Sequence, residues 1–348
     1  MNNTSQMMQR VRIEHHGGPE VLIQDQVPVP EPGEGEVVIR LKAMALNHLD
    51  LWVRRGVEGH RFPLPLIPGC DGSGIVHKIG SGVDSDLLGQ NILLSPGFSC
   101  GHCDQCTNDE DPLCSEYGIL GETCDGTCAE FVTVRAKQCL PKPENSTWEE
   151  AAAFPLSTLT SASMLEKARL KNHETLLVIA GTSGVGSMAI QLGKARGCRV
   201  IATGSTKEKR NKILQWGADE AIDPHEGDWW KRVKALTGGQ GADVVFENVG
   251  EATWSQSLLA LARGGRLTTC GATTGSLVPI ELKRLFFKNQ QIIGSTMGST
   301  SLLRELIVPF AARELVPVID SVYPFKDLAA AHQRMESRQS IGKIVITF

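Results

Sequence analysis

The chain has 348 residues, a formal net charge of −4 and a composition that is 41% hydrophobic and 21% charged. This length predicts two domains that each bury a core, and the weakly acidic charge excludes the basic surface that nucleic-acid binding requires. No apolar run approaches the roughly 20 residues of a membrane span, and the polar segment Met1–Arg10 lacks the apolar centre of a signal peptide. The sequence therefore predicts a cytoplasmic protein that binds neither nucleic acid nor membrane.

The first third of the chain is predicted to be rich in short strands. Val37–Ala43 is the clearest of them, and it follows a segment, 28–33, that prolines and a glycine interrupt. Shorter apolar runs recur at 74–76, 91–94 and 130–134, separated by glycine and proline. Strands of this length with such breakers are typical of a small barrel-like β domain.

The strongest local signal is a cluster of four cysteines within fifteen residues: Cys100, Cys103, Cys106 and Cys114. In a chain without a secretory segment this clustering indicates metal binding rather than disulfides. Four thiolates at such spacing can enclose one tetrahedral Zn²⁺ with no open position, which is the arrangement of a structural site. An iron–sulfur cluster and reduced, empty thiols are the alternatives. Cys124 and Cys128 have no accompanying histidine or second pair, so we expect them to be small buried hydrophobes.

Beyond Pro143 the pattern changes to alternating helices and strands. A helix is expected over 149–167, where Pro155 must interrupt or start a segment. Strands are predicted at 175–180, 199–203, 242–247, 265–270 and 291–295, with helices at 185–196 and 207–216. This alternation predicts an α/β fold with a doubly wound parallel sheet. A helix near 302–312, a strand near 317–322, a helix near 325–335 and a strand at 343–347 complete the chain.

A glycine-rich turn joins the first of these strands to the helix after it. Its residues are Gly181, Thr182, Ser183, Gly184, Val185 and Gly186. Glycines let backbone N–H groups approach a pyrophosphate, and the helix N-terminus adds its partial positive charge. Ser183 stands where the usual fingerprint has its middle glycine, but a strand before the turn and a helix after it are the context that the motif needs. We therefore expect a dinucleotide site here rather than an ordinary turn.

The end of the next strand indicates which dinucleotide binds. NAD enzymes usually place Asp or Glu there, about 20 residues beyond the glycines, to bond the ribose 2′-hydroxyl. This chain instead has a hydroxyl and cations, Ser205, Lys207, Lys209 and Arg210, while Glu208 is expected to belong to the first turn of the helix. Such a set suits a 2′-phosphate, so the sequence predicts NADP(H). A solvated, basic helix start is the alternative.

These features together resemble the medium-chain dehydrogenase/reductase superfamily, which includes zinc-binding alcohol dehydrogenases and quinone oxidoreductases. The resemblance covers nearly the whole chain, with further matching stretches at 47–50, 67–72, 121–126, 247–250 and 342–345. It implies a GroES-like, partly open β-barrel catalytic domain over 1–155 with a structural-zinc lobe at 96–117. It also implies a Rossmann NADP(H)-binding domain over 156–299 and a return segment, 300–348, that completes the catalytic domain.

The departures from the zinc alcohol dehydrogenases are as informative as the matches. The resemblance places their three catalytic-zinc ligands at Asn47, Cys70 and about Leu156, and the first hydroxyl of their proton relay at Leu49. One potential ligand in three does not make a catalytic zinc site, and a relay without a hydroxyl cannot carry the alcohol proton. Asn47 together with Asp50 is similar to the zinc-free quinone and enone reductase branch, in which hydride from NADPH goes to an electron-poor carbon.

The resemblance also implies individual site residues. Asn47, Asp50, Cys70 and Thr160 are expected in the catalytic site, with Thr160 also beside the nicotinamide, and His48 is expected at the pyrophosphate. Further cofactor contacts are expected from Asn248, Val249, Gly250, Gly271, Ala272, Met297 and Gly298. Each early position has an alternative: Asn47 and Asp50 as helix caps, Cys70 as inert core and His48 as an exposed turn residue.

Two other functions stay open. One is a zinc alcohol dehydrogenase with a non-standard site of His48, Cys70 and Asp71, although the adjacency of the last two makes a shared tetrahedron awkward. The other is a non-catalytic NADPH-binding protein, such as a redox sensor. The apolar segment 51–66 favours a small hydrophobic carbonyl or quinone as substrate. The resemblance implies a homodimer or homotetramer that pairs through the edge of the Rossmann sheet.

Overall fold

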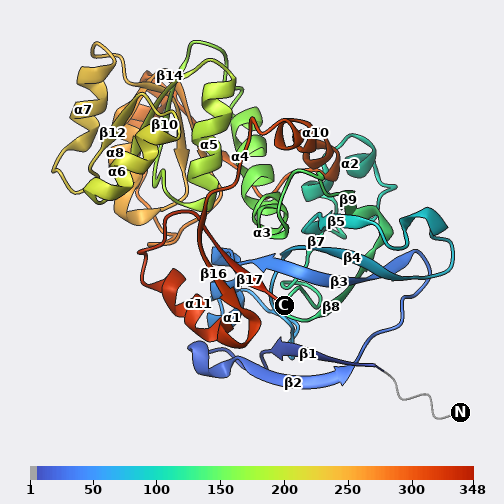
Figure 1. Cartoon of the computed structure of the whole chain (residues 1–348). Coiled ribbons are helices and arrows are strands. Elements are labelled where there is room, and N and C mark those ends of the chain that lie inside the picture. Colours follow the sequence, from blue (N-terminus) through green and yellow to red (C-terminus); the bar gives the residue numbers. More distant parts are fainter. Residues whose placement is uncertain (1–5) are drawn as a thin grey trace, which may run out of the picture. The chain divides into compact units, whose positions relative to one another are not determined.

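The structure is a computed structural model that describes residues 6–348 (Figure 1). The chain forms two compact units. The first contains the chain up to Leu156 and again from Gly298 onward, and the second contains Ser157–Met297. Within the described residues, no helix is both long enough and apolar enough to cross a bilayer.

The first unit is built around a seven-stranded sheet in the order β16-β17-β3-β4-β5-β9, with β8 pairing β3 off this path. These strands are β3 (Glu36–Ala45), β4 (Asp71–Ile79), β5 (Asn91–Leu94), β8 (Phe131–Arg135), β9 (Cys139–Pro141), β16 (Ile319–Pro324) and β17 (Lys343–Thr347). The end of β3 pairs antiparallel with β17, so that Ala45 lies opposite Val345. The last two strands of the chain, β16 and β17, therefore complete a sheet whose other members come from the first half, as the red and blue ribbons show (Figure 1).

Side chains along β3 and β17 alternate between two cores, because successive residues of a strand point to opposite faces. Met44 and Ile346 belong to one core. Ala45 and Val345 belong to the other, to which the alanines of α3 (Trp148–Ala153) also belong. Burial on both faces fixes the register of β17, since a slip of one residue would exchange the two sets.

The remaining elements of the first unit are short. Two further strand pairs are β1 (Met7–Arg12) with β2 (Ile23–Pro28) and β6 (Gly97–Phe98) with β7 (Gly118–Ile119). The helices are α1 (His48–Arg55), α2 (Asp104–Thr107), α10 (Thr300–Ala311) and α11 (Leu328–Glu336), and 3₁₀ turns lie at Pro19–Val21, Ser85–Leu87, Asp111–Leu113, Ala136–Gln138 and Phe325–Asp327. The buried Arg54 ties α1 to the tail of the chain, because it donates to the Gly17 carbonyl and pairs with Glu336 in α11.

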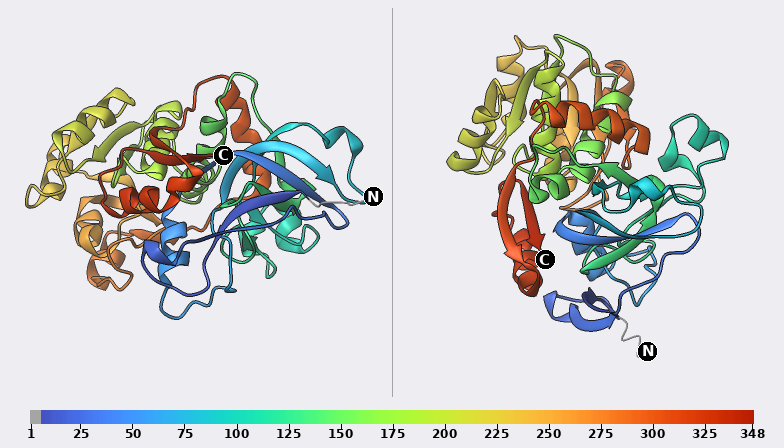
Figure 2. Two further views of the ribbon diagram at one scale, coloured as in Figure 1. Left: turned by 60° about the horizontal axis from the view of Figure 1, so that its bottom comes forward. Right: turned by 45° about the vertical axis from the view of Figure 1, so that its right-hand side comes forward.

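The second unit is a six-stranded parallel sheet in the order β12-β11-β10-β13-β14-β15. Its strands are β10 (Thr175–Val178), β11 (Arg199–Thr203), β12 (Glu220–Ile222), β13 (Ala242–Glu247), β14 (Leu261–Thr269) and β15 (Gln291–Gly294). The helices are α4 (Pro155–Lys167), α5 (Gly184–Ala195), α6 (Lys207–Gln215), α7 (Trp229–Leu236), α8 (Glu251–Ala260) and α9 (Leu282–Phe287), seen beside the strands in Figure 2. Ligands of such sheets bind beyond the carboxyl ends of the strands, where the strand order reverses at β10 and β13.

The predicted α/β class with a doubly wound parallel sheet is confirmed, with local differences. The helix expected over 149–167 is two helices, because Thr147 caps α3 in a capping box with Glu150 and Pro155 begins α4. β14 begins at Leu261, directly after α8, rather than near residue 265. The short helices α7, α8 and α9 lie where no element is predicted.

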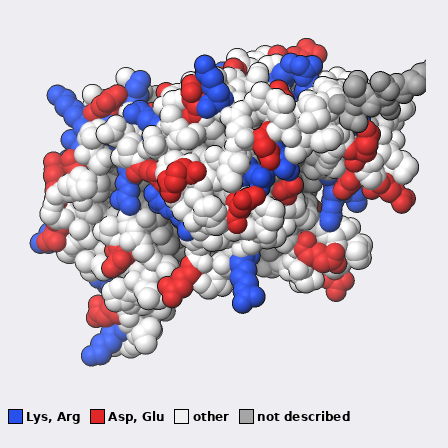
Figure 3. All heavy atoms as spheres, turned by 90° about the horizontal axis from the view of Figure 1, so that it is seen from below, with Lys and Arg blue, Asp and Glu red and all other residues white. Residues whose placement is uncertain are grey.

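Charged side chains are mixed on the face shown in Figure 3, where Lys and Arg groups lie among Asp and Glu groups. This agrees with the small formal net charge of −4. A mixed surface of this kind creates no extended positive field, which is what attracts a polyanion at long range.

Candidate functional site

Four cysteine sulfurs of the first unit converge in the lobe between β6 and β7. The ligand atoms of Cys100, Cys103, Cys106 and Cys114 all lie within 4.8 Å of one another. Cys100 Sγ and Cys106 Sγ are 3.8 Å apart, and Cys103 Sγ and Cys106 Sγ are 3.5 Å apart. Four sulfurs about 2.3 Å from one tetrahedral Zn²⁺ lie about 3.8 Å from one another. The four side chains therefore fit one tetrathiolate metal site.

Backbone N–H groups of this lobe donate to two of the four sulfurs. The Cys103 N–H donates to Cys100 Sγ at 3.4 Å, and the Glu116 N–H donates to Cys114 Sγ at 3.4 Å. Backbone N–H groups, first that of His102, lower the pKa of Cys100 to about 6, which favours the deprotonated form that metals bind. Zinc held by four sulfurs would support the fold and leave no coordination position for a substrate.

The lobe also holds the start of α10. Asp111, which lies between Cys106 and Cys114 in the sequence, accepts from the Thr300 N–H at 2.9 Å. Ser299 caps the same helix by accepting from the Leu302 N–H at 3.2 Å. The first N–H groups of a helix have no partner within the helix, and a carboxylate there is also favoured by the helix dipole. The lobe is thereby joined to the chain that returns from the second unit.

We expect Cys103→Ser to lower both the zinc content and the stability of the protein. A structural metal site contributes folding free energy, because the unfolded chain has no preformed site. Zinc measured by plasma mass spectrometry should fall from about one per chain to well below one, and Tm should fall by about 5 °C or more. Cys124→Ser, outside the cluster, is the control and should keep its zinc. Full zinc and an unchanged Tm in Cys103→Ser would contradict a structural site.

The first unit also contains what we call the buried polar cluster: Asn47, Cys70, Asp71 and Lys343. The Asn47 amide uses both of its ends, since Nδ2 donates to Asp71 Oδ2 at 2.9 Å and to Cys70 Sγ at 3.3 Å, and Oδ1 accepts from Lys343. Lys343 Nζ also pairs with Asp71 Oδ2 at 2.9 Å. All four residues are buried. The structure thus brings the expected residues Asn47 and Cys70 together, but around a lysine and an aspartate.

Asp50 lies in the first turn of α1, next to this cluster in the sequence. Its carboxylate accepts from the Asn47 N–H at 2.7 Å, so the capping role considered for this pair is present. Burial raises the pKa of Asp50 to about 7, although the Asn47 N–H and the charge of Lys343 oppose the rise. A carboxyl group with such a pKa can exchange a proton near neutral pH.

Cys70 and His48 are poorly suited to share a metal. Cys70 is fully buried, and burial raises its pKa well above the ordinary value, so the thiol keeps its proton. His48 is exposed. In the described part of the chain, the sets whose ligand atoms lie close enough to share a metal are the four cysteines and Cys100 with His102 and Glu116. The alternative site of His48, Cys70 and Asp71 is not among them.

In the second unit the glycine-rich turn follows β10 and opens α5. Ser183 is the N-cap of this twelve-residue helix, and its Oγ accepts from the Gly186 N–H at 3.0 Å. A Cβ on Gly186 would lie 2.3 Å from the Ala180 carbonyl oxygen, so a larger residue does not fit. The serine at the position of the usual glycine therefore caps α5. The N-terminus of this helix lies at the carboxyl end of β10.

The residues expected to select the dinucleotide follow β11. Ser205 and Lys207 are exposed and Lys209 is half-buried. Arg210 is engaged within the protein, because Nη1 donates to the Gly204 carbonyl at 3.0 Å and pairs with Asp223 at 2.5 Å. Since Asp223 offsets its charge, Arg210 is less suited to a phosphate than the prediction supposes.

The residues expected at the nicotinamide end lie near the carboxyl ends of β13 and β14. Asn248 Nδ2 donates to the Ile179 carbonyl at 3.1 Å, and Val249 and Gly250 follow directly. Gly250 has a φ of +91°, and a Cβ there would lie 2.5 Å from the Gly275 carbonyl oxygen. Thr160 Oγ1 and Met297 Sδ lie 4.0 Å apart, so the structure brings these two together. Gly271 and Ala272 come just after β14, and Gly298 begins the returning part of the first unit.

Three charged residues that organise these sites are missing from the predicted set. Asp71 is expected only in a matching stretch and in the alternative metal site, and Lys343 only as part of a matching stretch. Glu247 is fully buried, and its carboxylate accepts from the N–H groups of Val249 and Gly250 and from two hydroxyls. One signal was available: Glu247 ends an apolar strand and Lys343 begins one, and a charge on a buried strand needs a partner.

Comparison with known proteins agrees with this architecture. Residues 33–144 match the family model described as alcohol dehydrogenase GroES-like domain, and residues 184–313 match that of zinc-binding dehydrogenase. A zinc-type alcohol dehydrogenase-like protein of Schizosaccharomyces pombe is 30% identical, over 92% of this chain and 94% of its own. Quinone oxidoreductase 1 of Escherichia coli is 29% identical, over 98% of this chain and 99% of its own. The crystal structure of an NAD-dependent alcohol dehydrogenase has a TM-score of 0.94 at 41% identity, over 98% of this chain and 99% of that one.

Proposed function

Because the chain belongs to the medium-chain dehydrogenase/reductase superfamily, we propose that it is an NADP(H)-dependent oxidoreductase that passes hydride to a quinone or an α,β-unsaturated carbonyl without a catalytic metal. The observation that carries this proposal is the buried polar cluster. Its donors are already committed to one another around the Lys343 ammonium.

The donor set of the cluster does not suit a catalytic zinc. Cys70 is the one potential zinc ligand at the three expected positions, and its Sγ already accepts from Asn47 Nδ2 at 3.3 Å. Asn47 uses both ends of its amide within the cluster, and Leu156 offers only an apolar side chain. The ammonium of Lys343 adds a positive charge that repels a cation. This chemistry supports hydride transfer by orientation rather than by a Lewis acid.

Hydride transfer to a conjugated acceptor can proceed in this way. A bound nicotinamide supplies the hydride, and the protein supplies orientation and electrostatics. When the electron-poor carbon of the acceptor gains the hydride, the electrons of its C=C bond move toward the carbonyl oxygen, and a proton from solvent completes the reduction. Asp50, with a pKa of about 7, is suited to hand on that proton. The Asn47 N–H holds its carboxylate in place.

The choice of NADP(H) depends on the residues after β11. That strand ends at Thr203. The segment that follows contains Ser205, Lys207 and Lys209, and the acid among them, Glu208, lies in the first turn of α6. A ribose 2′-phosphate is matched by such hydroxyl and ammonium groups. NAD(H) is the competing cofactor, because an NAD-dependent alcohol dehydrogenase is among the similar structures.

We expect NADPH to bind at least tenfold more tightly than NADH, a difference of about 1.4 kcal/mol. Lys209→Ala should weaken NADPH several-fold and leave NADH unchanged, since only the 2′-phosphate distinguishes the two. Arg210→Ala should have a smaller effect on NADPH, because Asp223 already offsets its charge. Fluorescence titration measures both Kd values, with Lys231→Ala on α7 as a control at an exposed lysine. Equal Kd values in the unmodified protein would overturn the NADP(H) assignment.

Metal content and acceptor range together test the reaction. We expect about one zinc per chain, as for a single closed site, and reduction of enones or quinones that survives a chelator mild enough to leave the thiolate site filled. Simple alcohols should be poor substrates, because no Lewis acid stabilises the alkoxide. Two zincs per chain, with benzyl alcohol oxidation lost on chelation, would favour the alcohol dehydrogenase alternative. NADPH binding without turnover of any acceptor would favour the sensor.

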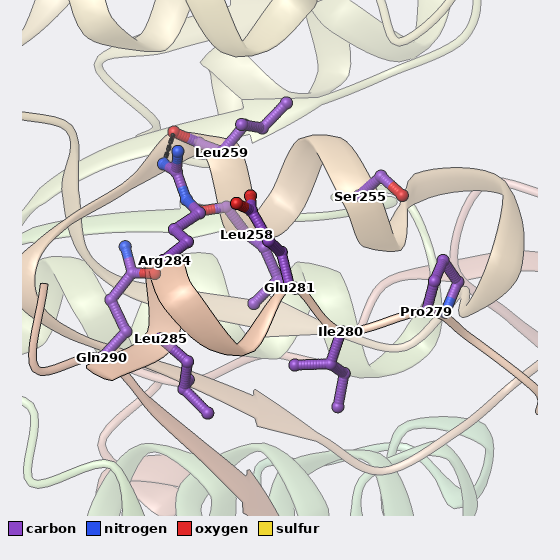
Figure 4. Close-up of a pocket in the computed structure, with 9 residues that line it drawn as sticks. All are labelled: Ser255, Leu258, Leu259, Pro279, Ile280, Glu281, Arg284, Leu285 and Gln290. Carbon is purple, nitrogen blue, oxygen red and sulfur yellow. Dashed lines mark hydrogen bonds between the residues drawn. The ribbon is translucent and has the colours of Figure 1, made fainter. Parts of the chain in front are cut away.

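The edge of the second unit supports a homodimer. β15 is an outer strand of its sheet, and the neighbouring segment exposes large apolar side chains: Leu277, Leu282, Phe286 and Phe287. A pocket of about 210 Å³ in the same region has leucine and isoleucine side chains beside Arg284 (Figure 4). An unpaired strand edge with an adjoining apolar patch is typical of a protein–protein contact. We therefore propose that two copies pair through β15, with a tetramer as the larger alternative.

Phe287→Asp is expected to break this dimer, because it places a charge among the exposed apolar side chains of this segment. Phe287 is 69% exposed, so the substitution should leave the fold of the isolated chain intact. Size-exclusion chromatography with light scattering should show the mass falling to that of one chain. Val308→Asp, at an exposed position of α10, is the control. A monomeric unmodified protein, or a variant that stays dimeric, would contradict this interface.

A further inference from the structure

Lys343 closes the buried polar cluster. It is the first residue of β17 and only 3% exposed, and its Nζ donates to Asn47 Oδ1 and to Asp71 Oδ2. The strand beyond it, Ile344–Ile346, is fully buried. The backbone from which the lysine extends is therefore held by packing, and the position of the ammonium is set by the sheet.

Asp71 connects its own strand to three other segments through its two carboxylate oxygens. Oδ2 accepts from Asn47 Nδ2 and from Lys343 Nζ, both at 2.9 Å. Oδ1 accepts from the Leu156 N–H, also at 2.9 Å. Asp71 begins β4, Asn47 precedes α1, Leu156 lies in the first turn of α4 and Lys343 begins β17. Leu156 is also the last residue of the first unit before the chain enters the second.

The two charges decide how the Asn47 amide is turned. Its oxygen faces the ammonium and its NH₂ group faces the carboxylate. A flipped amide would place a donor against a donor and an acceptor against an acceptor, so only one orientation satisfies both partners. That orientation also directs Nδ2 toward Cys70 Sγ.

Net stability does not require this ion pair. Replacing a buried pair by uncharged residues of similar shape is often neutral, whereas removing one partner is strongly destabilising. What apolar residues of similar shape cannot supply is the donor and the acceptor that tell the two ends of the Asn47 amide apart. The pair thus has more to contribute to the arrangement of the site than to the free energy of unfolding.

We propose that Lys343 is a positioning residue of the hydride-transfer site: through Asp71 and Asn47, its charge holds the Asn47 amide, the first turn of α1 and the chain at Leu156 in one arrangement. This inference rests on the proposed function, because that function places Asn47 and Asp50 at the acceptor.

Four variants separate charge from packing. Lys343→Met removes the charge and keeps the side-chain length, Lys343→Arg keeps the charge, Asp71→Asn removes the opposite charge, and the double variant Lys343→Met/Asp71→Asn removes both. Lys78→Met, which breaks the exposed pair with Glu31, is the matched control. Each variant is measured for Tm, for kcat and KM with NADPH and the best acceptor, and for metal content.

Lys343→Met should lower Tm by roughly 5–10 °C, because it leaves Asp71 buried without a cation. It should lower kcat by about 30-fold or more and change KM for NADPH by less than about threefold, which is the pattern for a loss felt mainly in the transition state. The double variant should regain at least half of the lost Tm without regaining kcat. Lys343→Arg should keep a kcat about tenfold above that of Lys343→Met, and Lys78→Met should match the unmodified protein.

Recovery of kcat together with Tm in the double variant would show that the ion pair only stabilises the fold. A raised KM for NADPH at unchanged kcat would place Lys343 on the nucleotide. Either result overturns the proposal.

A second readout needs no turnover. Iodoacetamide labelling of Cys70, followed by peptide mass spectrometry, should be slow in the unmodified protein and about tenfold faster in the double variant, because the Asn47 amide no longer faces Sγ. Equal protection in both would overturn the proposal. If the unmodified protein reduces no acceptor, the proposed function fails, and this labelling still decides whether Lys343 orders the cluster.

Discussion

A buried charge must be paired, and in the first unit this constraint is met by Asp71 and Lys343, which lie 272 residues apart in the sequence. Asp71 belongs to the half of the chain that forms most of the sheet, and Lys343 belongs to its last strand. Residues 1–156 alone would bury a carboxylate with no cation to face it. The buried polar cluster is therefore complete only when β17 is paired with β3.

The second unit also buries a carboxylate, but it satisfies that charge without a cation. Glu247 is fully buried at the end of β13, and its carboxylate accepts from the N–H groups of Val249 and Gly250 and from the hydroxyls of Thr253 and Ser257. Neutral donors from one short stretch satisfy the charge locally. The carboxylate before the loop after β13, where the nicotinamide end of a cofactor is expected, is thus satisfied by its neighbours in the sequence, whereas the polar cluster of the first unit depends on a distant strand.

This contrast explains what could be predicted from the sequence. The cysteine lobe, the glycine turn with Ser183 and the alternation of strands and helices are local patterns, and the structure shows these elements where they are expected. Lys343 with Asp71 and Arg210 with Asp223 are pairings set by topology. Nothing within a few residues of Arg210 indicates that its charge is offset. The helix α9 is short and largely exposed, so it carries no apolar periodicity from which it could be recognised.

The two points where the chain passes between the units are held in the same physical way. The chain leaves the first unit after Leu156 and returns at Gly298. The Leu156 N–H is bound by Asp71 Oδ1, and the Thr300 N–H is bound by Asp111 Oδ2. Both N–H groups lie in first turns, where a helix offers no acceptor of its own, so each aspartate satisfies a group that would otherwise be unpaired. Asp111 lies in the sequence between Cys106 and Cys114. A metal held by the four cysteines of that lobe would therefore serve the same end as the buried polar cluster, since it would fix where a connecting segment begins.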